Sequence, residues 1–181
     1  MKRALLIIDV QNDYFNGERQ IKYPQGSFEN ILKSMDIANE HDVPVIVVQH
    51  TPNAPGATRF VKGTPGWELH DKIKEKKYGY LVEKNLPGSF TGTELESILK
   101  KLGCDTVVIA GYMTQMCCDT TSRQAVHLGY NVEFLSDATG APDVSNYAGS
   151  VTAEQLHKAI LVTQAMRFSK VMTLEEWEKQ L

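Results

Sequence analysis

The chain offers three side chains that together suit acyl transfer: a carboxylate, an ammonium group and a thiol. Asp9 follows one apolar run, Lys84 ends a second, and Cys117 comes shortly after a third. A thiol attacks a carbonyl carbon once a base has taken its proton, and a nearby ammonium group stabilises the charges that develop. These residue types predict hydrolysis through a cysteine nucleophile.

The segment around the thiol is predicted to be a turn that leads into a helix over residues 117–128. Cys117 would then lie at or near a helix N-terminus, where unpaired N–H groups and the helix dipole stabilise a thiolate. The same N–H groups can bind the oxyanion that forms when a carbonyl is attacked. Cys118 would point elsewhere and belong to the core, and Cys104 would be structural, at the opposite end of the sheet.

Each of the three residues also has an ordinary structural interpretation. A cysteine in an apolar sequence is more often a small core residue. Asp9 could cap a turn, and Lys84 could be a solvated charge at the end of a strand. The catalytic interpretation therefore depends on whether the fold brings the three together.

Short apolar runs alternate with amphipathic stretches, which is the pattern of βαβ units around a parallel sheet. We expect six strands, over residues 4–9, 45–48, 80–84, 106–110, 131–135 and 168–172. Helices are expected with Ser27 as N-cap, around residues 67–75, and at the capping boxes Thr93/Glu96, Thr152/Gln155 and Thr173/Glu176. The capping box at Thr152 is followed by Leu156, Ala159, Ile160 and Thr163 at helical spacing.

The predicted fold class is α/β, with a single domain over residues 1–181. Its doubly wound, six-stranded parallel sheet should carry helices on both faces. Such sheets bind ligands beyond the carboxyl ends of the strands, at a switch point. Asp9, Lys84 and Cys117 all fall at that edge, so we expect them within reach of one another.

The composition excludes several other classes of protein. Of 181 residues, 42% are hydrophobic and 23% are charged, with a net charge of −3, which gives no basis for binding nucleic acid or an anionic membrane. No apolar run approaches the ~18 residues of a membrane span. Three cysteines make no disulfide framework, so we expect a reducing compartment, the cytoplasm. Neither a Gly-rich nucleotide-binding turn nor G-x-S-x-G occurs, so we expect no nucleotide or flavin cofactor and no serine nucleophile.

Five segments, in order, resemble the isochorismatase-like cysteine hydrolase superfamily, which includes nicotinamidases and N-carbamoylsarcosine amidases. The matching segments are Asp9–Tyr14, Gly63–Gly66, Val82–Lys84 with Ser89-Phe90, Gly111–Cys118, and Thr121, Arg123, Ala125, Gly129-Tyr130 and Asp137-Ala138. The resemblance covers nearly the whole chain and implies a Rossmann-like fold of this family.

The resemblance implies a role for each reactive group. Asp9 would be the general base, Lys84 would orient and stabilise the pair, and Cys117 would form an acyl-enzyme that water hydrolyses. The family also has a non-proline cis peptide, which would fall at Tyr112–Met113. The N–H groups of Met113 and Cys117 would then form the oxyanion hole, and the Thr-x-x-Cys spacing selects Cys117 over Cys118.

Two departures from the family narrow the function. Nicotinamidases hold a metal with an Asp-x-His pair and a later His, whereas this chain has His50 without the Asp and Arg59 in place of the later His. We therefore expect no metal ion. The remaining histidines, at positions 41, 70, 127 and 157, are expected on the surface or on helix faces. Relatives that cleave isochorismate, a vinyl ether, lack the nucleophilic cysteine, so the thiol favours cleavage of a C–N bond.

The resemblance also bears on substrate and assembly. Residues 49–66 resemble a branch that contains streptothricin hydrolases. The expected substrate-binding residues are Tyr14, Phe15, His50, Arg59, Trp67 and Tyr112. The substrate would be a small molecule with an amide, carbamoyl or lactam bond, and the protein would be a homo-oligomer, a dimer or a tetramer. The alternatives are a vinyl ether hydrolase and a catalytically idle interaction protein on the same fold.

Overall fold

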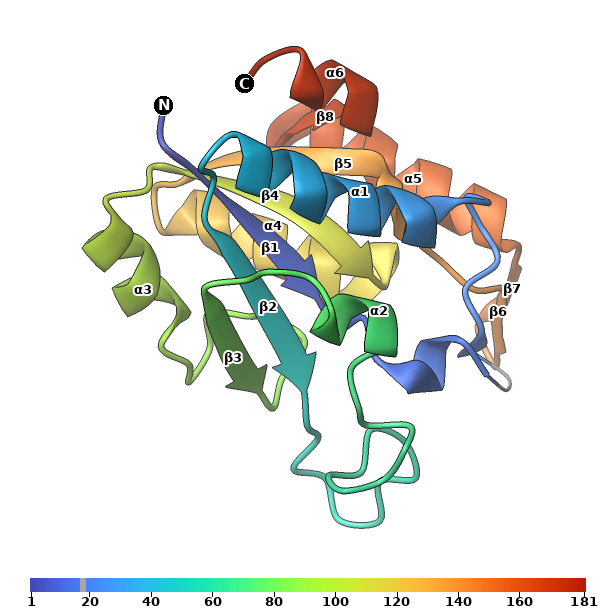
Figure 1. The fold of residues 1–181 in the computed structure, drawn as a ribbon. Coiled ribbons are helices and arrows are strands. Elements are labelled where there is room, and N and C mark those ends of the chain that lie inside the picture. Colours follow the sequence, from blue (N-terminus) through green and yellow to red (C-terminus); the bar gives the residue numbers. More distant parts are fainter. Residues whose placement is uncertain (17–18) are drawn as a thin grey trace.

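The computed structural model describes residues 1–16 and 19–181. Its centre is a parallel sheet of six strands in the order β3-β2-β1-β4-β5-β8 (Figure 1). The strands are β1 (Arg3–Ile8), β2 (Val45–His50), β3 (Tyr80–Lys84), β4 (Thr106–Tyr112), β5 (Asn131–Gly140) and β8 (Lys170–Met172). From β1 the chain first adds β2 and β3 on one side of the sheet and then crosses to add β4, β5 and β8 on the other side. The switch point that the sequence predicted for the site therefore lies between β1 and β4.

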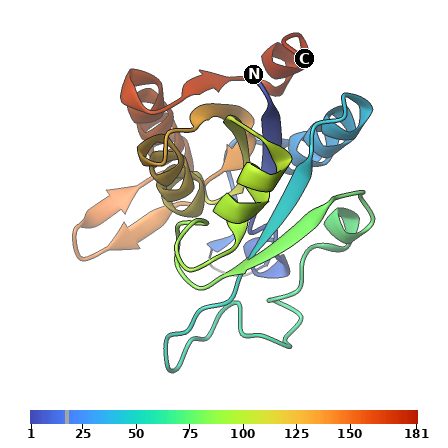
Figure 2. The ribbon, with the colours of Figure 1, turned by 90° about the vertical axis from the view of Figure 1, so that its left-hand side faces the viewer.

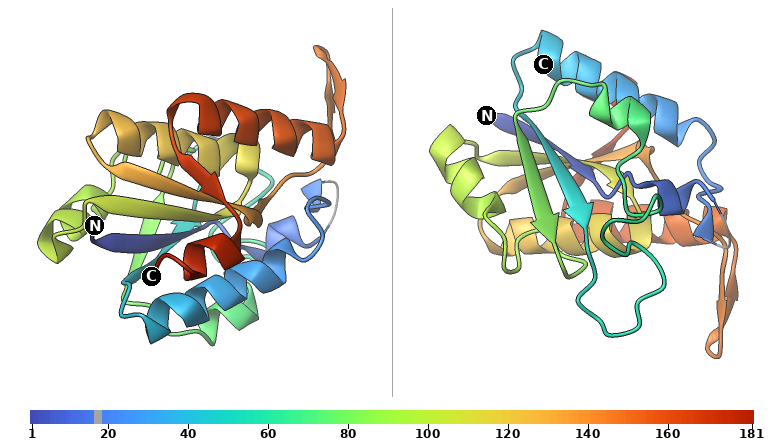
Figure 3. Two further views of the ribbon diagram at one scale, coloured as in Figure 1. Left: turned by 90° about the horizontal axis from the view of Figure 1, so that it is seen from above. Right: turned by 60° about the horizontal axis from the view of Figure 1, so that its bottom comes forward.

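Helices cover both faces of the sheet, as predicted (Figure 3). One face carries α1 (Ser27–Glu40), α2 (Asp71–Lys74) and α6 (Leu174–Glu178). The other carries α3 (Leu95–Leu102), α4 (Asp119–His127) and α5 (Ala153–Arg167). Successive residues of β1 alternate between the two cores, because side chains alternate across a strand. That double burial explains why β1 is a continuous apolar run.

Two of the three predicted capping boxes are confirmed. Thr152 caps α5 together with Gln155, and Thr173 caps α6 together with Glu176. The box at Thr93 is wrong: the N-cap of α3 is Glu94, and the Thr93 hydroxyl donates to the carbonyl of Ser89, at 2.6 Å.

Ser27 is also not a cap. Gly26 precedes α1 with a φ of 80°, which a glycine adopts without strain, and Ser27 becomes the first helical residue. The Ser27 hydroxyl instead lies 3.2 Å from the phenol oxygen of Tyr112. The predicted helix over 67–75 shortens to α2, and the last strand begins at Lys170 because Phe168 still caps α5.

The inward face of α5 includes two polar side chains. Ala159 is exposed, while His157 and Gln164 are buried. Polar partners on the neighbouring elements satisfy both buried side chains. Gln164 bonds to Ser122 and Asp119 of α4, at 2.7 Å each.

One further element was not expected. Strands β6 (Val144–Asn146) and β7 (Gly149–Val151) form an antiparallel hairpin between β5 and α5. It extends outward beyond the layer of α4 and α5 (Figures 2 and 3). No helix among the described residues has the length and apolar character needed to cross a membrane.

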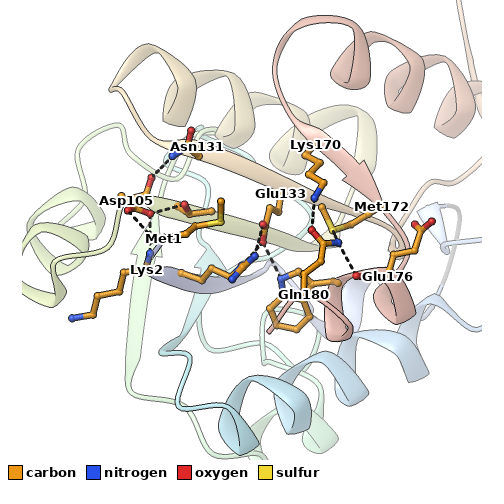
Figure 4. Close-up of polar contacts among 12 residues, drawn as sticks. Met1, Lys2, Asp105, Asn131, Glu133, Lys170, Met172, Glu176 and Gln180 are labelled. Atoms are coloured by element: carbon orange, nitrogen blue, oxygen red, sulfur yellow. Dashed lines mark hydrogen bonds and ion pairs between the residues drawn. The ribbon is translucent and has the colours of Figure 1, made fainter.

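The amino-terminal edge of the sheet is held by polar contacts, several of them shown in Figure 4. The carboxylate of Glu133 accepts two hydrogen bonds from Arg3, at 2.8 and 2.9 Å, and one from the indole of Trp177, at 3.0 Å. Asp105 accepts from the N–H of Lys2, at 2.9 Å. These contacts tie β1, β4, β5 and α6 together at the end of the sheet that lies away from the candidate site.

Candidate active site

Three strand ends place the predicted reactive groups side by side. Asp9 comes directly after β1, and its N–H donates to the carbonyl of Val48 of β2, at 2.9 Å. Lys84 is the last residue of β3. Cys117 belongs to the five-residue π-helical turn η3 (Thr114–Cys118), which follows β4 after Met113. Because β4 and β1 are neighbours in the sheet, the turn brings the thiol over the end of β1.

The three functional groups are in contact. The Lys84 ammonium lies 2.7 Å from Oδ2 of Asp9 and donates to Sγ of Cys117, at 3.4 Å. It also donates to the carbonyl of Leu86, at 3.1 Å. Asp9 and Lys84 are fully buried, and Cys117 is 5% exposed. The predicted proximity of these three side chains at this edge of the sheet is confirmed.

Burial sets the protonation state of the thiol. Loss of solvation raises the pKa of Cys117 strongly, and the charge of Asp9 raises it further, while Lys84 lowers it. Burial therefore opposes the thiolate that the sequence predicts at a helix N-terminus. The turn is π-helical, and the thiol lies beside the Asp9 side chain.

The charges around the thiol are arranged for proton transfer to Asp9. Burial by itself would lower the pKa of Lys84, but the electrostatic interactions and hydrogen bonds with Asp9 and Cys117 outweigh it and raise that pKa, so the ammonium form is held. Apart from Lys84 and the thiol, no donor in the described part of the chain reaches either oxygen of Asp9. The carboxylate is thus free to accept a proton from Cys117.

The turn that carries Cys117 is anchored to Met113 by backbone hydrogen bonds. The carbonyl of Met113 accepts from the N–H groups of Met116 and Cys118, at 3.1 and 3.2 Å. Among the backbone hydrogen bonds of the described turns and loops, none uses the N–H of Met113 or of Cys117 as donor. The Tyr112–Met113 peptide bond is cis.

Two residues hold this turn against the rest of the fold. Gly111 has a φ of 116°, and a Cβ there would lie 2.2 Å from the carbonyl oxygen of Ile8, so only glycine fits. From the other side, Nδ1 of His157 lies 2.8 Å from the hydroxyl of Thr114. Of the two predicted places for His157, the surface or a helix face, the structure has the helix face, and that face is buried.

His50 lies beside the cluster. Its Nδ1 is 3.4 Å from the Lys84 ammonium, and burial, followed by the Lys84 charge, lowers its pKa. The side chain of Gln11 holds its backbone by bonds to its N–H and its carbonyl, at 2.9 Å each. In the described chain, no group of three His, Cys, Asp or Glu side chains is placed to hold a metal ion.

Tyr14 and Phe60 form the aromatic side of the site. Their rings lie 4.9 Å apart, and the Phe60 ring lies 5.8 Å from that of His50. Burial, followed by electrostatic interaction with Cys117 and Asp9, raises the pKa of Tyr14. Phe60 was not predicted. Its φ of 53° is unusual for a non-glycine residue, and nothing in the sequence pattern marks it.

The other predicted substrate-binding residues lie farther from the thiol or are engaged elsewhere. Tyr112 and Phe15 pack in the core on the α1 side, with their rings 6.1 Å apart. The indole of Trp67 donates to the hydroxyl of Thr51, at 2.8 Å. Arg59 donates to the carbonyl of Asp13 and lies over the Tyr14 ring. Of the six, His50 contacts the cluster directly, and Tyr14 interacts electrostatically with Cys117 and Asp9.

Comparison with known proteins places the chain in one family. The family model for the isochorismatase domain matches residues 3–176. Nicotinamidase 3 from Arabidopsis thaliana is 30% identical, over 98% of this chain and 88% of that protein. A streptothricin hydrolase from Streptomyces noursei is 29% identical, over 80% of this chain and 54% of that protein. The crystal structure of a candidate isochorismatase from Burkholderia xenovorans LB400 superposes with a TM-score of 0.93 at 42% identity, covering 98% of this chain and 86% of that chain.

Proposed function

Since this chain belongs to the isochorismatase family of hydrolases, we propose that it cleaves a C–N bond, other than a peptide bond, in a small molecule. The reaction would pass through an acyl-enzyme on Cys117. The observation that carries this proposal is the buried contact of Lys84 with both Asp9 and Cys117. A Lys84 that was only a solvated charge, or a Cys117 that only filled the core, would not require this contact.

In the first half of the reaction, Asp9 takes the thiol proton as Sγ of Cys117 attacks the substrate carbonyl carbon. The C–N bond then breaks, and the protonated Asp9 returns the proton to the leaving nitrogen. This leaves a thioester on Cys117 and releases ammonia or an amine. Lys84 keeps its charge throughout and balances the negative charge that moves between Asp9 and the sulfur.

In the second half, water replaces the leaving amine. Asp9 takes a proton from water, the resulting hydroxide attacks the thioester carbon, and the C–S bond breaks. The proton then goes to the departing sulfur, which restores the thiol and releases a carboxylic acid. In both halves the carbonyl oxygen becomes an oxyanion, for which the N–H groups of Met113 and Cys117 are the proposed donors.

Two features favour an amide-like bond over a vinyl ether. A thiol nucleophile forms a thioester with a carbonyl carbon, and a vinyl ether offers no such carbon. Nicotinamidase 3 and the streptothricin hydrolase, both similar to this chain, are named for substrates that contain amide or lactam bonds. Tyr14, His50 and Phe60 are the proposed walls of the substrate site, which suits a small, planar carbonyl compound.

The test is a screen of small amides, ureido compounds and lactams, with detection of released ammonia and of ring opening. Cys117→Ala should abolish the activity found. Cys118→Ala is the matched control, because Cys118 is the next residue in the chain and its side chain is buried in the core. Acid quenching during turnover, followed by peptide mass analysis, should locate the acyl group on Cys117. Full turnover in Cys117→Ala, or an acyl group on another residue, would show that the nucleophile is misassigned.

A further inference from the structure

His50 and Lys84 lie side by side at the ends of two neighbouring strands. Strand β2 ends at His50 and β3 ends at Lys84, and the two residues are opposite each other in the parallel pairing of these strands (Figure 1). On the other side of β2, the buried side chain of Gln11 bonds to both the N–H and the carbonyl of His50. The sheet thus fixes the backbone of His50, and its Nδ1 lies 3.4 Å from the ammonium nitrogen of Lys84.

The Lys84 ammonium group decides which ring nitrogen of His50 carries the hydrogen. An ammonium group donates three hydrogen bonds and accepts none. An N–H on Nδ1 would point at this positive group and be repelled by it, so Nδ1 is the accepting nitrogen. Burial, followed by the charge of Lys84, also lowers the pKa of His50, against a smaller opposing effect of Asp9, and so disfavours a second proton. The neutral ring therefore carries its hydrogen on Nε2.

The other contacts of the ammonium group leave one hydrogen for the imidazole. Oδ2 of Asp9 and the carbonyl of Leu86 lie at 2.7 and 3.1 Å and take two of the three hydrogens. The third has two acceptors at the same distance, 3.4 Å, namely Sγ of Cys117 and Nδ1 of His50. A neutral thiol is a weak acceptor, so in the resting protein this hydrogen favours the imidazole. Lys84 thereby holds the His50 ring in one tautomer.

The Nε2–H group of His50 is left without a protein partner. Apart from Lys84, no group in the described part of the chain forms a hydrogen bond with this ring. In the same part of the chain, the side-chain nitrogen and oxygen atoms that are both fully buried and unpaired belong to Asp9 and Gln115. Nε2 is therefore open to solvent, on a side chain that is only partly buried. The ring presents an oriented donor next to the reactive thiol.

The surroundings of the ring restrict the ligand that this donor can bind. The Phe60 ring lies 5.8 Å from the imidazole, and Tyr14 lies 4.9 Å from Phe60. Beside apolar rings a hydrogen bond is electrostatically stronger than in open water. A ligand oxygen with partial negative charge suits both this donor and the charge of Lys84. A ligand N–H at the same place would leave two donors unpaired, which costs binding free energy.

We propose that His50 determines substrate specificity, by donating a hydrogen bond from Nε2–H to the substrate. The substrate class is thereby narrowed to small amides, ureido compounds or lactams with a second carbonyl oxygen near the scissile one. This inference rests on the proposed function, because it takes the carbonyl group over Cys117 as the reacting group. His50 and Cys117 both contact the same ammonium group, so one small molecule reaches both.

The tautomer of His50 can be measured without any substrate. In isotope-labelled wild-type protein at neutral pH, NMR correlation of the histidine ring nitrogens with the ring hydrogens should show His50 with its hydrogen on Nε2. The signals are assigned by their loss in His50→Gln. A hydrogen on Nδ1, or a ring with both nitrogens protonated at this pH, would overturn the proposal.

Binding to Cys117→Ala tests the donor itself, since this variant lacks the proposed nucleophile and should leave the ligand intact. The probes are two pairs of primary amides in which a C=CH₂ group replaces the second C=O: pyruvamide with methacrylamide, and acetoacetamide with its methylidene analogue. In at least one pair, the amide with the second carbonyl should bind about fivefold to tenfold more tightly, which is the net gain of about one hydrogen bond. Kd is measured by NMR titration.

Two substitutions of His50, each combined with Cys117→Ala, separate the donor from the bulk of the ring. His50→Gln places an amide N–H near the position of Nε2 and should keep the preference. His50→Asn reaches only the position of Nδ1 and should abolish it. His41→Asn, at an exposed position, is the matched control and should leave every Kd unchanged.

Three results would overturn the role of His50: equal Kd values within both pairs, no measurable binding of either dicarbonyl amide, or a preference that survives in His50→Asn. Failure of the proposed function has a different signature. A Cys117→Ala protein that shows the His50-dependent preference, together with a wild-type protein that hydrolyses no amide and forms no acyl-enzyme, would refute the hydrolysis and leave the binding role of His50 in place.

Discussion

Lowering the pH from 7 to 5 should reduce the free energy of unfolding by about 2 kcal/mol through His157 alone. His157 is 2% exposed and is bonded at both ring nitrogens. Nε2 lies 2.9 Å from the carbonyl oxygen of Ser136, which can only accept, so Nε2 must carry the hydrogen. Nδ1 then accepts from the hydroxyl of Thr114. The neutral ring therefore satisfies both contacts, and a second proton would sit in a buried site.

The magnitude follows from the two protonation equilibria. Burial lowers the pKa of His157 from 6.5 to about 4 in the folded protein, against the opposing effect of the Ser136 carbonyl. Between these values the unfolded chain binds a proton that the folded chain does not, so stability falls as the pH falls. At pH 7 neither state holds the proton. The loss of free energy of unfolding is about 1.36 kcal/mol for each pH unit below the unfolded pKa. Because pH 5 lies about 1.5 units below that pKa, the loss there is about 2 kcal/mol.

Urea unfolding followed by circular dichroism at pH 7, 6 and 5 would measure this loss. The pH dependence, rather than the stability at one pH, is the informative quantity, because His157→Gln also removes packing and hydrogen bonds. The wild-type protein should lose about 2 kcal/mol more than His157→Gln over this range. His127→Gln, at an exposed position of α4, should keep the wild-type dependence. Equal losses in wild type and His157→Gln would refute the assignment of this pH dependence to His157.

Three further outcomes follow from the site. Asp9→Asn should reduce hydrolysis by several orders of magnitude, because an amide cannot take the thiol proton. For the same reason it should slow the alkylation of Cys117 by iodoacetamide, measured by intact mass. An unchanged alkylation rate would show that Asp9 is not the base. Gly111→Ala should lower the free energy of unfolding, measured in urea, by about 3–5 kcal/mol, because the added Cβ meets the backbone of Ile8. Gly79→Ala is the control and should lower it far less, because a Cβ there would lie 3.7 Å from its nearest neighbour, the carbonyl oxygen of Val45. Treatment with a chelator should leave the Cys117-dependent activity unchanged, and activity lost to the chelator and restored by zinc would reveal a metal requirement.

The location of the cluster could be predicted from the sequence because few physical rules determine it. Continuous apolar runs identify buried parallel strands, and the carboxyl ends of such strands meet at one edge of the sheet. Asp9 and Lys84 each stand at the end of such a run, so their proximity followed once the strands were recognised. Cys117 needed only the additional inference that a turn, and not a further strand, follows β4.

What could not be predicted depends on contacts between segments that are distant in the sequence. On α5, the capping box at Thr152 marked where the helix begins, but the residues that it buries are decided by partners on other elements. His157 contacts Thr114 and Ser136, and Gln164 contacts α4, so these two polar residues turn inward. Phe60 escaped prediction for the same reason. Its position beside Tyr14 and His50 is set by a long loop whose path the local sequence does not reveal.

The enclosure of the thiol determines how it can be activated in the proposed reaction. Burial raises the pKa of Cys117, so release of its proton to water, leaving an isolated buried thiolate, is costly. Transfer of that proton to Asp9 is different, because a thiolate beside a neutral acid carries the same total charge as a thiol beside a carboxylate. Lys84 contacts both groups and balances either arrangement. The same burial that suppresses a free thiolate therefore leaves proton transfer within the cluster accessible, which makes the reactivity of Cys117 dependent on Asp9.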